Sequence, residues 1–209
     1  MSYFPIVLEM TGRRCLVIGG GVVAERKIAG LLEVSAAVTV ISPEVTPAIL
    51  NWSKKHSIQL TARCYQNGDL SGHELVFVVA DDPDVNDRVY QEGKSCGAWV
   101  NAADDPDHCD FILPAVIRRG ELMVAISTGG ASPAATRAIR EELDGYFTED
   151  FAQMVQVAAE VRIMLKEKSV NVDADAWNSA LKGEVRRLIR AGRPEQAKSF
   201  LLTTLGVRS

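Results

Sequence analysis

The chain has 209 residues, of which 47% are hydrophobic and 24% charged, ordinary proportions for a globular protein. Its formal net charge of −4 argues against a general affinity for nucleic acid, which usually needs a basic surface. No apolar run approaches the roughly 20 residues of a membrane span, and the N-terminus lacks the pattern of a signal peptide. The four cysteines are scattered and form no Cys-x-x-Cys pair. We therefore expect a cytoplasmic protein without a metal site, a disulfide framework or a membrane partner.

Short apolar runs alternate with helical patterns through the first half of the chain. The run at Arg14–Ile18 does not alternate in polarity, which predicts a strand buried on both faces. Repeated strand–helix–strand units predict a parallel sheet with helices on both faces, a Rossmann-like α/β domain over residues 1–112. The expected strands are 14–18, 37–41, 58–64, 75–80 and 98–102, and the expected helices are 22–32, 47–56 and 86–96.

The pattern changes after Cys109. Residues 111–117 and 122–127 read as two strands of a hairpin, and Ser132-Pro133 is a typical start for a helix that runs to about Phe147. Apolar residues at helical spacing then predict core-facing helices, because such stripes usually pack against one another. These helices are expected over 151–165, over 177–188 and from Pro194. The sequence thus predicts a small hairpin-plus-helix region over 113–147 and a C-terminal helical domain over 148–209.

Three successive glycines follow the first predicted strand. Gly19, Gly21 and Ala24 match the dinucleotide fingerprint G-x-G-x-x-A. The first glycine permits a tight turn, the second lets the backbone approach a pyrophosphate, and the alanine lets the helix pack closely on the strand. The N–H groups of Val22 and Val23 would then point at the phosphates, at the positive end of the helix dipole. The alternatives are a bare structural turn or a site for another nucleotide such as S-adenosylmethionine.

The end of the second predicted strand lacks the acidic residue that commonly binds the ribose of NAD. Ser42, Pro43 and Glu44 follow it instead, and Ser42 or Glu44 could contact a ribose hydroxyl. No arginine stands there to bind a 2′-phosphate, which favours NAD over NADP as the cofactor.

A second constellation of polar residues follows the last strand of the predicted sheet. Residues 101–111 contain four aspartates, at positions 104, 105, 107 and 110. Ligands of open α/β sheets bind beyond the carboxyl ends of the strands, where a carboxylate can act as a general base while a hydride leaves for the cofactor. The alternative is a solvated turn rich in Asp and Pro. His108 is expected in an exposed loop, and Cys109 is expected to be a small packed residue.

A third polar segment, Ser127–Pro133, is a glycine loop that leads into a capped helix. Such a helix start is suited to anions, and arginines lie on both sides of it in the sequence. It suggests a substrate that carries carboxylates or phosphates, whereas the alternative is an ordinary loop with a solvated helix face. The candidate substrate-binding residues are Arg118, Arg119, Thr128, Gly129, Ser132 and Arg137.

Three stretches taken together carry a specific resemblance: CLVIGGGVVAERK, VNAADDPDHCDFILPAVIRRGELMVAISTGGASP and ATRAIREEL. They resemble the precorrin-2 dehydrogenase module of the siroheme synthase family, over nearly the whole chain and most weakly after about residue 150. The resemblance implies NAD-dependent oxidation of precorrin-2 to sirohydrochlorin, and some members of the family also insert Fe²⁺ to give siroheme. The chain is too short to include the methyltransferase module that is fused to some relatives.

The resemblance also implies roles for individual residues. The family's key aspartate corresponds to Asp104, and its NAD contacts correspond to Val22, Val23, Pro43 and Glu44. Precorrin-2 carries many carboxylates, which gives the arginines and the Thr128–Ser132 loop a purpose. The resemblance further implies a homodimer built through the hairpin and helices after Phe111, so that 113–147 is a dimerisation and substrate region.

Two other classes of function stay open at this stage. A non-catalytic NAD-sensing module would use the glycine loop but would need no base at Asp104. An NAD-dependent dehydrogenase of a different, small acid would use both. Ferrochelatase activity has no sequence motif that separates it from the acids of the dehydrogenase.

Overall fold

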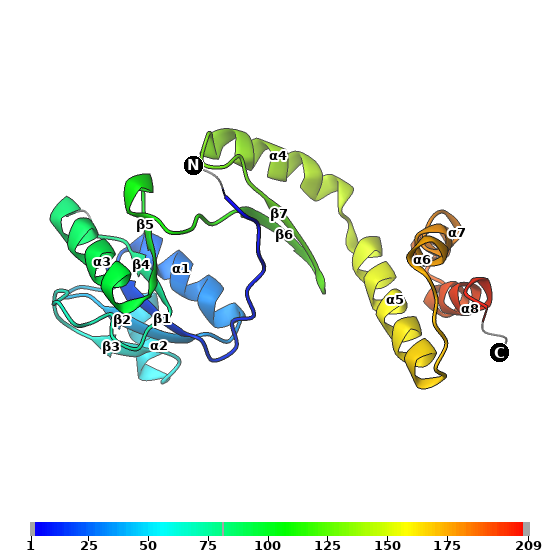
Figure 1. Ribbon diagram of the computed structural model, residues 1–209, viewed down its shortest axis with the longest axis horizontal. Coiled ribbons are helices and arrows are strands. Elements are labelled where there is room, and N and C mark those ends of the chain that lie inside the picture. Colours follow the sequence, from blue (N-terminus) through cyan, green and yellow to red (C-terminus); the bar gives the residue numbers. More distant parts are fainter. Residues whose placement is uncertain (1–2, 81, 207–209) are drawn as a thin grey trace. The chain divides into compact units, whose positions relative to one another are not determined.

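The computed structural model describes residues 3–80 and 82–206. The chain divides into two compact units, one ending at Ile112 and the other beginning at Leu113 (Figure 1). Two clusters of buried side chains lie in the first unit and one lies in the second. Each unit therefore has a hydrophobic core of its own.

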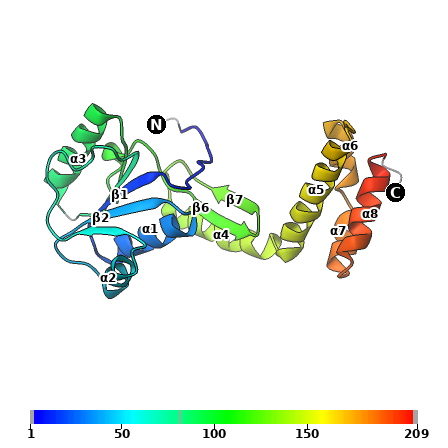
Figure 2. The ribbon, with the colours of Figure 1, turned by 90° about the horizontal axis from the view of Figure 1, so that it is seen from below.

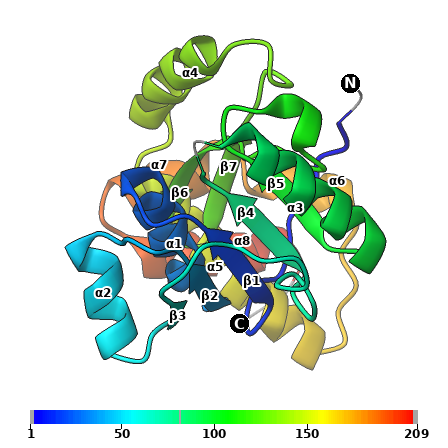
Figure 3. The same ribbon diagram turned by 90° about the vertical axis from the view of Figure 1, so that its left-hand side faces the viewer.

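A five-stranded parallel sheet forms the centre of the N-terminal unit, in the order β3-β2-β1-β4-β5 (Figure 3). In the central strand, Ile18 pairs with Ile41 of β2 on one side and with Val78 of β4 on the other, so these strands end at one edge. The observed sheet confirms the predicted Rossmann-like α/β architecture. Its strands are β1 (Arg14–Ile18), β2 (Ala37–Ile41), β3 (Gln59–Thr61), β4 (Leu75–Val78) and β5 (Trp99–Ala102).

Helices cover both faces of this sheet. Cys15 and Val17 of β1 pack on the α1 and α2 side, whereas Leu16 and Ile18 pack on the α3 side. Alternate side chains of a strand point to opposite faces, and every one of these is buried, which explains why the run did not alternate in polarity. The three helices are α1 (Val22–Glu33), α2 (Pro47–Lys54) and α3 (Pro83–Cys96).

Two elements of this unit differ from their predicted bounds by three residues at one end, whereas the other ends differ by at most two. The strand expected over 58–64 is reduced to Gln59–Thr61, and the turns after it are held by a 2.7 Å ion pair between Arg63 and Asp69. The helix expected from residue 86 begins at Pro83, because the Asp82 carboxylate accepts a hydrogen bond from the Asp84 N–H. Both corrections come from polar side chains that fix the local backbone.

The C-terminal unit begins with an antiparallel hairpin, β6 (Ala115–Arg119) and β7 (Leu122–Ile126). Its first strand starts at Ala115 rather than at the predicted residue 111. The single helix expected over 177–188 is two helices, because Gly183 adopts a left-handed φ of 72° between them. The helices of this unit are α4 (Pro133–Tyr146), α5 (Glu149–Glu167), α6 (Ala174–Ala180), α7 (Glu184–Arg190) and α8 (Pro194–Thr204).

The core of the C-terminal unit belongs to its last four helices. Val161 of α5, Val185 of α7 and Leu201 of α8 are fully buried in one cluster, and these helices lie side by side (Figure 2). The hairpin has one buried side chain, Ile117, which lies outside this cluster, and α4 has no buried residue. Within 3–80 and 82–206, no helix combines the length and the apolar character needed to cross a membrane.

Candidate active site

The glycine turn between β1 and α1 is fixed by two close backbone contacts. Gly19 has a φ of 117°, and a Cβ atom there would lie 2.4 Å from the Val79 carbonyl oxygen. A Cβ on Gly20 would lie 2.0 Å from the Glu44 carbonyl oxygen, so this position also requires glycine. Sequence reasoning assigned roles to Gly19 and Gly21 only. The unbroken run of three glycines, with Gly20 in its middle, was the signal that could have revealed the requirement at Gly20.

Gly21 has a different environment from its two neighbours. A Cβ built on it meets no atom of the described residues within 4 Å, so its side opens to solvent directly before α1. Gly21 is the N-cap of that helix, and no side chain caps it. Val22 and Val23 are exposed, while Ala24 is buried against the sheet. The result is a helix start with uncapped N–H groups and room above them, which fits a pyrophosphate.

The three predicted cofactor contacts after β2 differ in exposure: Ser42 is buried, whereas Pro43 and Glu44 are exposed. Ser42 is only 6% exposed, and its hydroxyl donates a 2.6 Å hydrogen bond to the Glu44 carbonyl oxygen. Ser42 therefore lies beneath the glycine turn and shapes it, because its Oγ would be 2.8 Å from a Cβ on Gly20. Pro43 and Glu44 are exposed above it.

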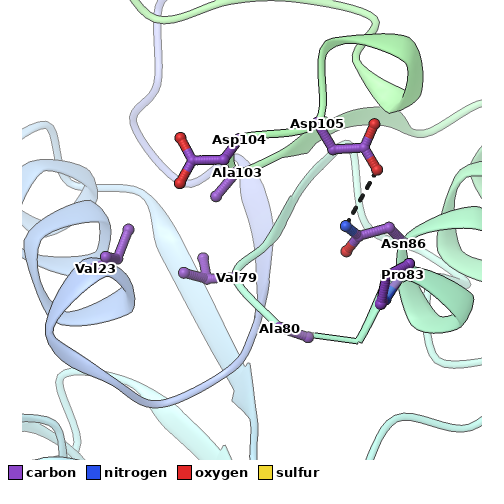
Figure 4. Close-up of a pocket in the computed structure, with 8 residues that line it drawn as sticks. All are labelled: Val23, Val79, Ala80, Pro83, Asn86, Ala103, Asp104 and Asp105. Carbon is purple, nitrogen blue, oxygen red and sulfur yellow. Dashed lines mark hydrogen bonds between the residues drawn. The ribbon is translucent and has the colours of Figure 1, made fainter.

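A cleft of about 320 Å³ lies at the carboxyl edge of the sheet, within the N-terminal unit. Its walls come from the first turn of α1, the ends of β4 and β5, and the start of α3 (Figure 4). The cleft lies where the strand order reverses, between β1 and β4, which is where open α/β sheets bind ligands. Its lining residues are Val23, Val79, Ala80, Pro83, Asn86, Ala103, Asp104 and Asp105.

Asp104 stands two residues beyond the end of β5 in a left-handed backbone conformation, with φ of 59°. Asp and Asn tolerate this conformation better than other residues that carry a Cβ. Asp104 is exposed on the rim of the cleft, and its carboxylate points away from Asp105 (Figure 4). No hydrogen bond or ion pair to its carboxylate occurs within the described part of the chain. The geometry therefore presents a carboxylate that is open to an incoming molecule.

The neighbouring aspartates are engaged within the protein. Asp105 Oδ2 lies 2.7 Å from His108 Nδ1 and accepts a 3.2 Å hydrogen bond from Asn86 Nδ2. Asp110 accepts a 2.9 Å hydrogen bond from the Val100 N–H and also binds Lys94. These contacts make both residues parts of the scaffold beneath Asp104, whereas Asp107 is exposed outside the cleft lining.

His108 is half-buried rather than in an exposed loop, which corrects the sequence-based expectation. Its ring contacts the edge of Tyr90 with centroids 5.3 Å apart, and its Nε2 lies 3.5 Å from Asp87. The hydrogen bond to Asp105 raises the pKa of His108, against the effect of burial, and the charge of Asp87 adds to this rise. Sequence reasoning missed this network because its partners lie on α3, some 20 residues earlier.

Lys27 links α1 to the start of the segment 101–111, which contains the four aspartates. Its ammonium group donates a 3.1 Å hydrogen bond to Asn101 Oδ1 and lies 5.4 Å from the centre of the Phe77 ring. Burial lowers the pKa of Lys27, and the nearby Cys109 and Asp104 oppose this shift. Burial also raises the pKa of Cys109, so its packed side chain stays a neutral thiol. Sequence reasoning also missed Lys27.

In the C-terminal unit, several predicted substrate contacts are used by local structure. Thr128 Oγ1 accepts a 3.1 Å hydrogen bond from the Ser132 N–H, and Ser132 Oγ caps α4 by accepting from the Ala135 N–H at 3.2 Å. Arg119 binds the carboxylate of Asp144 at 3.0 Å. Arg118, Gly129 and Arg137 remain exposed, and Arg137 lines a shallow cleft on α4. Across residues 3–80 and 82–206, no cluster of three or more His, Cys, Asp or Glu could hold a metal ion.

Comparisons with known proteins agree with this geometry. A family model described as NAD(P)-binding matches residues 6–115, and a second, described as Sirohaem biosynthesis protein central, matches residues 119–146. The first unit is therefore an NAD(P)-binding domain. The solved structure of SirC, precorrin-2 dehydrogenase, is 30% identical, covers 97% of this chain and 98% of its own, and has a TM-score of 0.77.

Siroheme synthases from several bacteria are similar to this chain over part of their length. The siroheme synthase of Nitrosococcus oceani is 35% identical over 98% of this chain and 44% of its own length. The siroheme synthase of Methylococcus capsulatus is 36% identical over 97% of this chain and 43% of its own length. The chain thus spans less than half the length of these relatives, but nearly all of the solved one. It belongs to the family formed by the precorrin-2 dehydrogenase module of siroheme synthases.

Proposed function

We propose that this chain oxidises precorrin-2 to sirohydrochlorin with NAD⁺ as the hydride acceptor, a step in siroheme biosynthesis. Its likeness to SirC, a precorrin-2 dehydrogenase, supports this proposal over nearly the full length of both chains. The observation that carries it is the position of Asp104, an open carboxylate on the rim of a cleft beside the start of α1. A cofactor-sensing module would not need such a carboxylate.

The residues around the glycine turn are suited to hold the dinucleotide. The turn Gly19–Gly21 would let the backbone approach the pyrophosphate, and the N–H groups of Val22 and Val23 would donate to its oxygens. Pro43 and Glu44 then face the adenosine half. The negative charge of Glu44 would repel a 2′-phosphate, which favours NAD over NADP. Ser42 supports this segment from below through its hydrogen bond to the Glu44 carbonyl oxygen.

Asp104 is proposed as the general base. Bound NAD⁺ would supply the hydride acceptor, and Asp104 would take the proton that precorrin-2 loses in the same oxidation, so that the products are sirohydrochlorin, NADH and a proton. The exposure of Asp104 lets it pass that proton to water after each turnover. Asp105 and Asp110 hold the loop in place through their own hydrogen bonds.

The C-terminal unit is proposed to contact the carboxylates of the substrate. Arg118 and Arg137 are exposed and could each form a charge-assisted hydrogen bond with a carboxylate. Gly129 could add a backbone contact. Thr128, Ser132 and Arg119 are proposed to shape this surface indirectly, since their polar atoms already bind within the unit.

We further propose a homodimer formed through the hairpin and α4. None of the residues of α4 is buried, and Ile139 and Tyr146 are 40% and 58% exposed. An uncovered apolar helix face of this kind usually packs against another protein surface. Analytical ultracentrifugation at micromolar concentration should give twice the monomer mass of 22.7 kDa, and Ile139→Glu should reduce it to that value. A monomeric wild-type protein would contradict this proposal.

The test of the catalytic proposal is a direct assay. Precorrin-2 is generated from uroporphyrinogen III with a methyltransferase, and the absorbance of NADH is followed after addition of this chain and NAD⁺. We expect NADH and sirohydrochlorin to form in equal amounts. Binding of NAD⁺ without any turnover would contradict the enzyme and support a sensing module. Addition of Fe²⁺ to the product then tests whether the chain also forms siroheme.

A further inference from the structure

The amide group of Asn86 is an unusual feature of the cleft. Asn86 lies in the first turns of α3, and only 7% of it is exposed. Its Nδ2 donates to Asp105, but its Oδ1 is buried and has no hydrogen-bond donor in the described part of the chain. Figure 4 shows the amide end of the side chain directed into the cleft. A buried acceptor without a donor is costly, so its presence in a ligand cleft indicates that a ligand supplies one.

The orientation of this amide is fixed by the residues behind it. Asp105 Oδ2 receives hydrogen bonds from Asn86 at 3.2 Å and from His108 at 2.7 Å. Burial raises the pKa of Asp105, but the hydrogen bonds from His108 and Asn86 outweigh this effect and lower it. The carboxylate is therefore ionised at neutral pH and can only accept. As a result, the NH₂ group of Asn86 must face Asp105, and its oxygen must face the cleft.

The position of the cleft identifies which part of a dinucleotide reaches it. The pyrophosphate cradle lies at the start of α1, and the adenosine side extends toward β2, where Pro43 and Glu44 are exposed. The other half of the dinucleotide must then extend over β4 and β5, the two strands on the opposite side of β1. Asn86 and Asp104 both line the cleft at these strands.

We propose that Asn86 is the residue that binds the carboxamide of nicotinamide, with its Oδ1 accepting a hydrogen bond from the carboxamide NH₂ group. This inference rests on the cofactor part of the proposed function. The carboxamide is the one group on the nicotinamide ring that offers N–H donors. The contact sets the rotation of the ring, and thus which face is turned toward Asp104 and the substrate. Asp105 and His108 act as positioning residues, because they hold the amide of Asn86 in the accepting orientation.

The test compares three ligands on the wild-type chain by isothermal titration calorimetry. NAD⁺ has the carboxamide, 3-acetylpyridine adenine dinucleotide replaces its NH₂ with a methyl group, and ADP-ribose lacks the ring. We expect the acetyl analogue to bind roughly 3- to 10-fold more weakly than NAD⁺, the effect of one hydrogen bond. Equal affinities for these two ligands would overturn the proposal. Failure to bind ADP-ribose would instead contradict the pyrophosphate cradle itself.

Variants then assign the effect to Asn86. Asn86→Leu should bind NAD⁺ and the acetyl analogue equally, while ADP-ribose binds as in the wild type. Asp105→Ala should also reduce the preference for NAD⁺, because the amide of Asn86 is then free to rotate. The control Asn51→Leu, on the exposed side of α2, should keep the full preference. Retained preference in Asn86→Leu, or an equal loss of ADP-ribose binding, would show that Asn86 has only a structural role.

Discussion

The cleft of the N-terminal unit and the hairpin–α4 region of the C-terminal unit differ in what holds their predicted site residues in place. In the N-terminal unit, a sheet buried on both faces positions the cleft, and the Asp104 carboxylate and the start of α1 are left open. In the hairpin and α4, the polar groups of Thr128, Ser132 and Arg119 bind within the unit, while Ile139 and Tyr146 of α4 stay exposed. The cleft therefore relies on a packed sheet for its shape, whereas the hairpin and α4 depend more on hydrogen bonds and ion pairs of the predicted site residues themselves.

The largest expected effect concerns Asp104. Asp104→Asn should lower the rate of precorrin-2 oxidation by about 10²–10⁴-fold, the usual contribution of a general base, while NAD⁺ affinity stays near that of the wild type. Asparagine is the right replacement because it tolerates the left-handed φ of 59°, so the backbone is not strained. Steady-state kinetics at saturating NAD⁺ measures this loss.

The control for that experiment is Asp107→Asn, an exposed aspartate outside the cleft, which should oxidise precorrin-2 at nearly the normal rate. A normal rate in Asp104→Asn would place catalysis in the positioning of substrate and cofactor instead. The same assay on Arg137→Gln should mainly raise KM, which would locate substrate binding in the second unit and the chemistry in the first.

Substitutions at two adjacent glycines of the turn should affect different properties, NAD⁺ binding at Gly21 and the stability of the fold at Gly20. Gly21→Asp should abolish NAD⁺ binding in a folded protein, because its side chain enters open space at the phosphate site. Gly20→Ala should lower the free energy of unfolding by about 1–3 kcal/mol, because its Cβ would meet the Glu44 carbonyl oxygen. Isothermal titration calorimetry measures the loss of NAD⁺ binding, and thermal melts measure the loss of stability.

A third glycine provides the matched control. Gly30 lies inside α1, and a Cβ there meets no described atom within 4 Å, so Gly30→Ala should stabilise the N-terminal unit by about 0.5–1 kcal/mol. Equal stability of the Gly20→Ala and Gly30→Ala variants would mean that the turn is more adaptable than its contacts indicate.

The C-terminal unit has its own ionic anchor at Asp150. Burial raises the pKa of this carboxylate, but hydrogen bonds from Thr148, Arg186 and Arg190 outweigh it and lower the value to about 2. Because the folded pKa is depressed, this stabilisation is present above the unfolded value of about 3.9 and is lost as the pH falls toward 2. Asp150→Asn should lower the free energy of unfolding by about 1–3 kcal/mol at neutral pH. The lower end of this range is expected, because the pair with the exposed Arg190 is screened by solvent.

Denaturant unfolding followed by circular dichroism measures that cost. NAD⁺ affinity should not change, since Asp150 lies outside residues 6–115, which match the NAD(P)-binding family. Arg187→Gln is a suitable control. Arg187 and Glu184 both lie on the surface of α7 and pair with each other, and exposed pairs of this kind contribute little to stability. If both variants lose the same stability, Asp150 is not a special anchor.

The smallest expected effect is a pH dependence in the N-terminal unit. The raised pKa of His108 means that its charged form stabilises the fold below pH about 6.5, and that this contribution is lost as the pH rises through the folded value. Asp105, whose pKa is lowered, contributes above pH about 3.9. The pair therefore stabilises the unit most between these two values.

Thermal melts of His108→Gln and the wild type test this dependence. The difference between their midpoints should be larger at about pH 6 than at about pH 8.5, because only the wild type gains from the charged imidazole. A difference that grows with pH would have the wrong sign for this pair and would point to packing against Tyr90 as the main role of His108.

The sequence allowed prediction of those features that depend on local patterns. The parallel sheet and the glycine turn follow from buried strands and from spacing along β1 and α1. The break at Gly183 was missed because apolar spacing continues across it, so the pattern alone predicts one helix. The roles of Gly20 and Asn86 were missed because they depend on Glu44 and Asp105, which only the folded chain brings close. Tertiary contacts of this kind leave no periodic signal.

The central place of β1 has a consequence for the order in which the chain can fold during synthesis. Of the five strands of this sheet, β1 is synthesised first, yet one of its partners, β4, follows more than 50 residues later, after β2 and β3. Until then one edge of β1 has no neighbouring strand, and the apolar residues of its α3 side lack Val89 and the strands β4 and β5 from their cluster. Contacts so distant along the chain form slowly. The nascent chain therefore passes through a stage with an open sheet edge, in which pausing or chaperone binding would matter most.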